Sequence, residues 1–250
     1  MLVQIDYELQ FDAPFHLGTG ITAGMVDRTV IRDAGGDIYV PASTFKGVLR
    51  EHCEQLCRFY LPNAQVDNPH DPYAALAQFG KAPPLISRIF GSPLHPGGLR
   101  FNDARQEAET HSAYKEIQTS TSTQVRIDRV TRTAANEALY TIEFGTRYLL
   151  FEGTIKGLLN CTPIKELTKT IQGQETYTLT PTYSLLILLA GLLMVEQLGG
   201  NKSTGKGQCR CSITNVQLDK RKCSQEQWQS WIERLDVLQD YPSAEKGGQA

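Results

Sequence analysis

The sequence has no excess of charge of either sign and no apolar run of membrane length. Its 25 Lys and Arg residues nearly balance 27 Asp and Glu residues, which leaves a formal net charge of −2. This balance gives no global sign of nucleic-acid binding, although a local basic patch would still act over a Debye length of about 10 Å. The longest apolar run, residues 185–195, is shorter than the roughly 20 residues of a membrane-spanning helix. We therefore expect no contact with a membrane.

The sequence also lacks the pattern of a secretion signal and of a disulfide framework. Its first ten residues, MLVQIDYELQ, contain acids and no basic segment, unlike a signal peptide. Six cysteines in 250 residues are expected to be reduced thiols rather than paired ones. These observations predict a cytoplasmic protein.

Alternation of apolar and polar residues predicts strands over residues 2–12 and 99–103, a hairpin over 139–157, and a strand that includes Cys209, Cys211 and Ile213. Helical spacing from Phe45 to Phe59 predicts a first long helix, capped by Ser43 or Thr44. The run from Leu185 to Leu198 predicts a second, buried helix, with Thr180 as its N-cap and Pro181 at its first position.

This order of strands and helices is typical of an α+β, ferredoxin-like (RRM-related) fold with insertions. Residues 61–97 hold seven of the twelve prolines and are expected to form an insertion or lid rather than core. A second, polar insertion is expected over residues 104–138. We expect a single domain over residues 1–218 and a C-terminal extension over 219–250.

The segment GGNKSTGKG, residues 199–207, nearly matches the P-loop of nucleotide-binding proteins. A P-loop joins a strand to the helix after it and ends in a Ser or Thr that binds Mg²⁺. Here a helix comes first, a strand follows, and Gly207 occupies the last place, so we expect no NTPase. The residues alone leave two interpretations open: a solvated turn after a helix cap, or a phosphate-binding loop of Gly amides and lysines.

A second candidate phosphate site lies at the start of the first helix. Ser43 and Thr44 begin this helix, and Lys46 and Arg50 are one turn apart on it. A helix N-terminus with basic side chains attracts phosphate. The same residues also fit an ordinary capped helix with a solvated basic face.

Several short motifs follow one another in a specific order. They are HLG (16–18), VD (26–27), VIRD (30–33), YVPASTFKGVLR (39–50), RIFG (88–91), LRFND (99–103), IDRVT (127–131) and GGNKSTGKG (199–207). In this order they resemble the RAMP proteins of CRISPR systems over roughly residues 1–218. Within that superfamily they are most similar to the repeating backbone subunit of type III effector complexes.

The resemblance implies a ferredoxin-like core and a subunit that binds guide RNA (crRNA). Such subunits stack along the guide beside neighbouring RAMP subunits and other proteins of a multi-protein complex, and a thumb hairpin displaces a nucleotide at regular intervals. The residues expected to contact RNA are His16, Arg28, Ser43, Thr44, Lys46, Arg50, Arg126, Arg129, Arg132, Gly199, Gly200, Lys202, Ser203, Gly205 and Lys206.

The resemblance also implies a metal-dependent endoribonuclease that cuts complementary target RNA by attack of the RNA's own 2′-OH. Asp27 stands where such subunits have an essential Asp, so we expect it to be catalytic and to bind a divalent ion, Mg²⁺. A carboxylate can hold such an ion or take up a proton. His16 is expected to be a binding residue or a second catalytic candidate. Without the resemblance, Asp27 would be interpreted as an Asp that caps a turn or pairs with Arg28.

Some features depart from the family pattern or leave alternatives open. Thr204 and Lys206 stand where relatives often have Arg and an aromatic residue, and the thumb expected around residues 133–140 is short. Two alternative functions are open: a noncatalytic structural or capping subunit of the same complex, and a stand-alone enzyme that processes guide RNA. Zinc binding by Cys53 and Cys57, with His52 and His70 nearby, is also open, although the usual C-x2-C spacing is absent.

Overall fold

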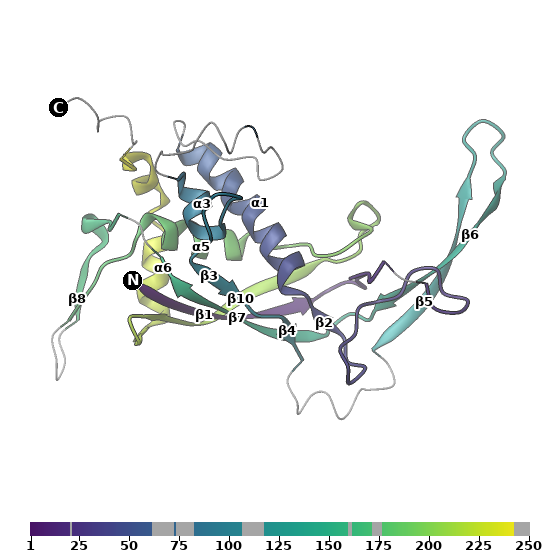
Figure 1. The fold of residues 1–250 in the computed structure, drawn as a ribbon, viewed down its shortest axis with the longest axis horizontal. Helices are drawn as coiled ribbons and strands as arrows, with labels where there is room; N and C mark the ends of the chain where they lie inside the picture. Colours follow the sequence, from purple (N-terminus) through teal and green to yellow (C-terminus); the bar gives the residue numbers. More distant parts are fainter. Residues whose placement is uncertain are drawn as a thin grey trace.

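A four-stranded antiparallel sheet forms the centre of the protein (Figure 1). The computed structural model describes residues 1–20, 22–61, 73, 83–106, 118–159, 162–171 and 177–242. The central strands have the order β10-β1-β7-β3, and each pairing is antiparallel. Their bounds are Leu2–Phe11 (β1), Leu99–Phe101 (β3), Leu150–Leu158 (β7) and Cys209–Leu218 (β10).

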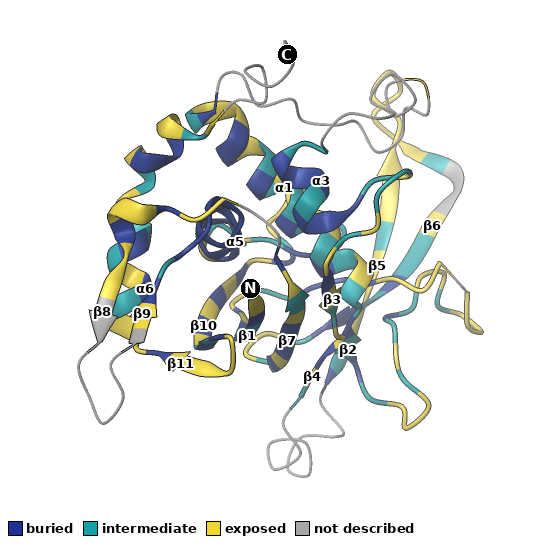
Figure 2. Cartoon of the chain, turned by 60° about the vertical axis from the view of Figure 1, so that its left-hand side comes forward, coloured by how far each residue is buried: buried dark blue, intermediate teal, exposed yellow. Residues whose placement is uncertain are grey.

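Two helices connect these strands and cover one face of the sheet (Figure 2). Helix α1 (Ala42–Tyr60) lies between β1 and β3 in the chain, and α5 (Tyr183–Leu193) lies between β7 and β10. This β-α-β-β-α-β order is that of the ferredoxin-like fold. The predicted α+β, ferredoxin-like fold is therefore confirmed.

The alternation in β1 explains its central place. Val3, Ile5, Tyr7 and Leu9 are buried against the helices, whereas the residues between them lie on the polar face. The ring of Tyr7 stacks on that of Phe45 in α1, with centroids 4.4 Å apart. Apolar burial of this kind contributes roughly 25 cal/mol for each Å² removed from water.

Shorter elements extend the sheet and cover its ends. β11 (Arg221–Cys223) pairs with β10, and β4 (Ala104–Arg105) joins β7 to β2 (Tyr39–Val40). A separate ladder consists of β8 (Lys169–Ile171) and β9 (Tyr177–Leu179). Other helical segments with described bounds are α3 (Leu85–Phe90), α6 (Gln225–Ile232), and the 3₁₀ turns η2 (Lys165–Leu167), η3 (Lys202–Thr204) and η4 (Leu235–Asp240).

A long two-stranded hairpin projects from the body of the protein (Figure 1). It consists of β5 (Thr119–Ile127) and β6 (Ala134–Gly145), which pair antiparallel from Thr119–Gly145 to Ile127–Ala134. The short thumb expected around residues 133–140 is therefore wrong, because the hairpin covers residues 119–145. The hairpin expected over residues 139–157 is wrong as well, because β6 pairs with β5 whereas β7 pairs with β1. β5 is exposed along most of its length, so it has no apolar alternation by which a sequence pattern could identify it.

The caps expected for the two long helices are also wrong. α1 begins at Ala42 after Pro41, and its first amide donates to Oδ1 of Asp103 at 2.8 Å rather than to Ser43 or Thr44. α5 begins at Tyr183, and Thr182, not Thr180, accepts the capping hydrogen bond. In both cases the helix starts within three residues of the predicted position.

The hydrophobic core includes residues from two ranges that the sequence analysis places outside it, residues 61–97 and residues 219–250. Within residues 61–97, the α3 side chains Leu85, Ile86, Ile89 and Phe90 are buried in the main hydrophobic cluster. Beyond residue 218, Trp231 of α6 is fully buried in the same cluster. Residues 62–72, 74–82 and 107–117 of the expected insertions lie outside the described residues. Among the helices that are described, none is long and apolar enough to cross a membrane.

Candidate nucleic-acid interface

Three segments that are far apart in the sequence meet at the base of the hairpin. They are the loop after β1 (residues 12–33, the first loop), the end of β6, and residues 199–207 (the glycine loop). The backbone hydrogen bonds that join them run from Phe15 N–H to Gly145 O (3.1 Å), Gly145 N–H to Phe15 O (2.7 Å), Gly200 N–H to His16 O (2.8 Å) and Gly207 N–H to Pro14 O (2.9 Å). The motifs around His16 and around Gly200 therefore belong to one site.

His16 lies at the centre of this junction and is only 8% exposed. Its Nδ1 atom is 2.8 Å from the backbone oxygen of Glu143. A carbonyl oxygen can only accept, so Nδ1 is the donor in this hydrogen bond. Nε2 packs against Gly18, where a Cβ atom would come within 2.7 Å of it. The ring also makes an edge contact with Phe144, with centroids 5.9 Å apart.

Asp27 is exposed and is fixed to β6 through both its backbone and its side chain. Its amide donates to the oxygen of Thr141 at 2.9 Å, and its Oδ2 accepts from the amide of Thr141 at 2.7 Å. The next residue, Arg28, forms a parallel bridge with Ile142 and is exposed as well. The first loop therefore pairs with the hairpin through an isolated bridge, and Asp27 is exposed beside it.

Glu143, a residue that the sequence patterns do not single out, holds the following part of the first loop. Its Oε2 accepts from the amide of Val30 at 2.9 Å, and its Oε1 accepts from Nη2 of Arg32 at 2.6 Å. Burial opposes ionisation of this carboxyl, but the hydrogen bonds from Val30 and Arg32 outweigh it and lower the pKa of Glu143. The one sequence signal is an acid placed between the buried residues Ile142 and Phe144.

The glycine loop follows α5 after residues 194–198, makes the 3₁₀ turn η3 and precedes β10, so the predicted helix–loop–strand order is confirmed. Its amides at Thr204, Gly205 and Lys206 donate to oxygens within the loop itself. These three amides are therefore engaged within the loop, and the lysine side chains are candidates for phosphate binding. Lys202 is exposed, as is Ser203, and Nζ of Lys206 lies 5.2 Å from the centre of the Phe144 ring.

The candidate residues of α1 are used partly for packing. Nζ of Lys46 lies 5.6 Å from the centre of the Phe101 ring, and burial, followed by the charge of Arg50, lowers the pKa of Lys46. Arg50 donates to Glu54 at 2.8 Å and to the oxygen of Gly91 at 3.0 Å. Ser43 is exposed and Thr44 is half-buried. Within the described part of the chain, no hydrogen bond or ion pair joins these residues to Asp27 or to the glycine loop.

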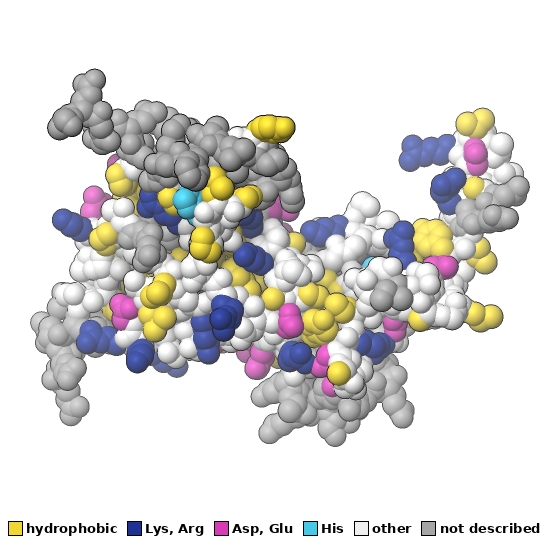
Figure 3. Space-filling model, viewed as in Figure 1, with side chains coloured by type: hydrophobic (Ala, Val, Ile, Leu, Met, Phe, Trp, Pro, Cys, Tyr) yellow, Lys and Arg dark blue, Asp and Glu magenta, His cyan; other side chains and the backbone are white. Residues whose placement is uncertain are grey.

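Three arginines of the hairpin, Arg126, Arg129 and Arg132, are exposed near its tip. Oδ1 of Asp128 accepts from the amides of Val130 at 2.7 Å and Thr131 at 3.1 Å, which fixes the tip turn. Figure 3 shows Lys and Arg side chains at the outer end of the hairpin and others between it and the body. The three arginines therefore lie toward the tip of the hairpin, whereas Asp27 bonds to Thr141, nearer the hairpin base.

The expected divalent ion is compatible with Asp27, whereas the alternative zinc site at Cys53 and Cys57 has few ligands among the described residues. Mg²⁺ is usually held by one or two carboxylates together with substrate phosphates and waters, and an exposed Asp carboxylate suits this mode. Cys53 and Cys57 are buried, and burial raises the pKa of the Cys57 thiol to about 12. No group of three or more His, Cys, Asp or Glu residues among those described could hold a metal, and His70 lies outside them.

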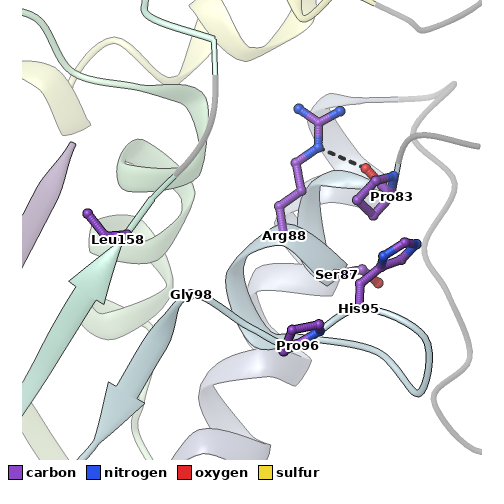
Figure 4. Close-up of a pocket in the computed structure, with 7 residues that line it drawn as sticks. All are labelled: Pro83, Ser87, Arg88, His95, Pro96, Gly98 and Leu158. Atoms are coloured by element: carbon purple, nitrogen blue, oxygen red, sulfur yellow. Dashed lines mark hydrogen bonds between the residues drawn. The ribbon is translucent and has the colours of Figure 1, made fainter.

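A separate cavity of about 440 Å³ lies between α3 and the end of β7 (Figure 4). Its lining includes Ser87, Arg88, His95 and Leu158, and Nε of Arg88 donates to the oxygen of Pro83 at 2.8 Å. None of the residues that line it belongs to the first loop, the hairpin or the glycine loop. The junction at β6 is therefore the better candidate for the functional site.

A protein-family model matches most of the chain. The model of the RAMP superfamily matches residues 8–210, a range that includes the first loop, the hairpin and the glycine loop. No curated protein matches the chain. On this match, the chain belongs to the RAMP superfamily of CRISPR-associated, RNA-binding proteins.

Proposed function

We propose that the protein is the guide-RNA-binding backbone subunit of a type III CRISPR effector complex, and that it cleaves complementary target RNA at Asp27. The observation that supports this best is the convergence of His16, Asp27 and the glycine loop on residues 141–145 of β6. Candidate RNA-binding groups and an exposed carboxylate thus contact one short stretch of strand.

Guide binding would use side chains more than backbone amides. Lys202 and Lys206 lie on the glycine loop, next to His16, and their charges would pair with successive phosphates of the guide. Arg126, Arg129 and Arg132 would contact RNA beyond the site through the hairpin tip. A single strand held in this way needs no overall positive charge, since the basic groups lie within about one Debye length of it.

The cleavage step needs few protein groups, because RNA supplies the nucleophile. The 2′-oxygen attacks the adjacent phosphorus while its proton passes to a base, and the bond to the 5′-oxygen breaks as that oxygen gains a proton. The products are a 2′,3′-cyclic phosphate and a 5′-hydroxyl. Asp27 would accept the proton or hold Mg²⁺ together with the RNA phosphate, and a bound Mg²⁺ would supply positive charge at that phosphate.

The test compares two Asp→Asn variants in the assembled complex. Asp27→Asn should retain guide RNA and bind target, but should cut at least about 100-fold more slowly, since general base or metal catalysis is lost. Asp219→Asn is the matched control, because Oδ1 of Asp219 accepts from the amide of Leu2 at the same 2.7 Å distance. It should cut at the wild-type rate, and chelation of divalent ions should stop wild-type cutting.

Other outcomes would favour other functions. Cutting by Asp27→Asn at the wild-type rate would contradict a catalytic role for Asp27. A wild-type complex that binds guide and target without cutting would favour a noncatalytic structural or capping subunit. Cleavage of naked repeat RNA by the isolated protein, lost in His16→Ala, would favour a guide-processing enzyme.

A further inference from the structure

We propose that Glu143 is a positioning residue: it holds His16 and the segment around Asp27 in one fixed arrangement on the hairpin. This inference rests on the proposed function, because the position of Asp27 matters only if Asp27 acts on RNA. It assigns to the hairpin a second task, which is to serve as the frame on which the cleavage residue is mounted.

Every polar group of Glu143 is bonded to a segment of the site. Its amide donates to the oxygen of Arg28 at 2.9 Å, and its backbone oxygen lies 2.8 Å from Nδ1 of His16. Its two carboxylate oxygens accept from the amide of Val30 and from the guanidinium of Arg32, at 2.9 and 2.6 Å. One residue of β6 thus contacts the first loop on both sides of Asp27.

Arg32 extends this arrangement to the other strand of the hairpin. Its Nη2 also donates to Oγ1 of Thr119, the first residue of β5, at 3.2 Å. Its Nη1 donates to the oxygen of Gly36 at 3.1 Å, beyond the first loop. The Arg32–Glu143 pair therefore joins the first loop to both strands at the hairpin base.

Burial of the Glu143 side chain favours a fixed geometry on the carboxylate side of the pair. The Glu143 side chain is only 14% exposed, and that of Arg32 is 36% exposed. A charge-assisted hydrogen bond to a mostly buried carboxylate is stronger and more directional than one between two exposed side chains. Because all partners of the carboxylate are donors, an amide at position 143 would turn its NH₂ group toward one of them.

The consequence for activity is a separation of cutting from binding. The lysines of the glycine loop do not contact the Glu143 side chain, so guide binding should survive its loss. In-line attack, in contrast, is sensitive to the placement of the catalytic group, and a displacement of about 1 Å can slow a reaction about 100-fold. Loosening Glu143 should therefore lower the rate of cutting at saturating target.

The experiment uses Glu143→Gln in the assembled complex. We expect guide retention and target affinity within about twofold of wild type, and cutting about 10- to 100-fold slower. Hydrogen exchange at the amides of Asp27 and Thr141, whose reciprocal bonds depend on this arrangement, should become faster. Arg32→Lys keeps the charge but not the forked contact, and should give a smaller change of the same kind.

Glu54→Gln is the matched control. Glu54 also pairs with an arginine, at 2.8 Å, and its side chain is 15% exposed, but it lies on α1. It should lower stability comparably while cutting and exchange at Asp27 stay unchanged.

Three results would overturn the inference. The first is that Glu143→Gln changes neither the rate of cutting nor the amide hydrogen exchange at Asp27 and Thr141. The second is that guide binding and cutting fall together while this hydrogen exchange stays normal. If Glu143→Gln does not fold, the test passes to Arg32→Lys. A complex with Arg32→Lys that cuts and exchanges as wild type does would then overturn the inference. If the wild-type complex does not cut at all, the proposed function fails, whereas the exchange measurement still shows whether Glu143 fixes the Asp27 segment.

Discussion

The side chain of Asp27 accepts a hydrogen bond from the amide of Thr141 at 2.7 Å, and the amide of Asp27 donates to the oxygen of Thr141 at 2.9 Å. The two residues are 114 positions apart in the chain. This reciprocal pair fixes the Asp27 backbone and occupies Oδ2 of its carboxylate. It also means that two substitutions of Asp27 will differ in their effects.

Comparison of Asp27→Asn with Asp27→Ala should separate the role of Asp27 in RNA cleavage from its role in holding the first loop on β6. Asn can still accept from the Thr141 amide, so the segment should remain in place while the charge is lost. Ala removes the acceptor, and loss of such a hydrogen bond costs about 1 kcal/mol. We expect urea unfolding to show a lower stability for Asp27→Ala only, with cutting lost in both. Equal stability of the two variants would contradict the docking role.

Replacement of Lys202 and Lys206 by Ala should weaken guide binding in a salt-dependent way. Each lost phosphate contact on a single strand should reduce the slope of log K against log salt by about 0.7. The double variant should therefore bind more weakly at low salt and approach wild type as salt rises. Binding titrations at several salt concentrations measure this slope.

Lys165 and Lys222 provide the control for that measurement, because both are exposed and lie outside the first loop, the hairpin and the glycine loop. Their replacement should leave the slope unchanged. A similar reduction in both double variants would indicate that only net charge matters, and that the glycine loop is not the contact surface.

The sequence predicts the core of the fold well because the core is periodic. The alternation in β1 and the apolar run of α5 each indicate a buried face. β1 lies where its pattern indicates, whereas α5 ends at Leu193, five residues before the predicted end at Leu198. β5 has no such signal, since its residues are exposed on both faces of the hairpin. The length of the hairpin therefore cannot be read from local pattern.

The site is less predictable because its contacts are distant in the sequence. Glu143 reaches Val30 across 113 positions and His16 across 127. Spacing on α1 likewise places Arg50 on a basic face, but does not reveal that its guanidinium donates to the oxygen of Gly91. Family motifs locate His16 and Asp27, whereas only the folded chain identifies the residue that joins them.

Gly199→Ala should destabilise the protein more than Gly205→Ala. Both glycines have positive φ angles, +93° and +77°, so each substitution strains the backbone by roughly 1 kcal/mol or more. At Gly199 a Cβ would also lie 2.5 Å from the oxygen of His16, whereas nothing lies within 4 Å of one at Gly205. The difference between the two unfolding free energies therefore isolates the close approach of the glycine loop to the first loop. Equal losses would contradict that approach.

Stability should fall in mild acid, and Glu143 should account for part of the fall. Burial opposes its ionisation, but hydrogen bonds from Val30 and Arg32 lower its pKa below the usual value of 4.5. A carboxyl with a lowered folded pKa contributes stability that is fully present above its unfolded pKa. That contribution is lost as the pH falls through the folded pKa. The backbone amide of Asp37, and then Arg105, act in the same direction on the pKa of Asp33.

Urea unfolding between pH 7 and pH 3 measures this dependence. Glu143→Gln has no proton to gain at that position, so its stability should be lower than wild type at pH 7, and the two curves should converge as the pH falls below about 4.5. If the unfolding free energies of the two proteins change in parallel with pH, the Glu143 carboxyl has the same pKa in the folded and unfolded chains. The hydrogen bonds to Val30 and Arg32 would then contribute nothing to holding the first loop on the hairpin.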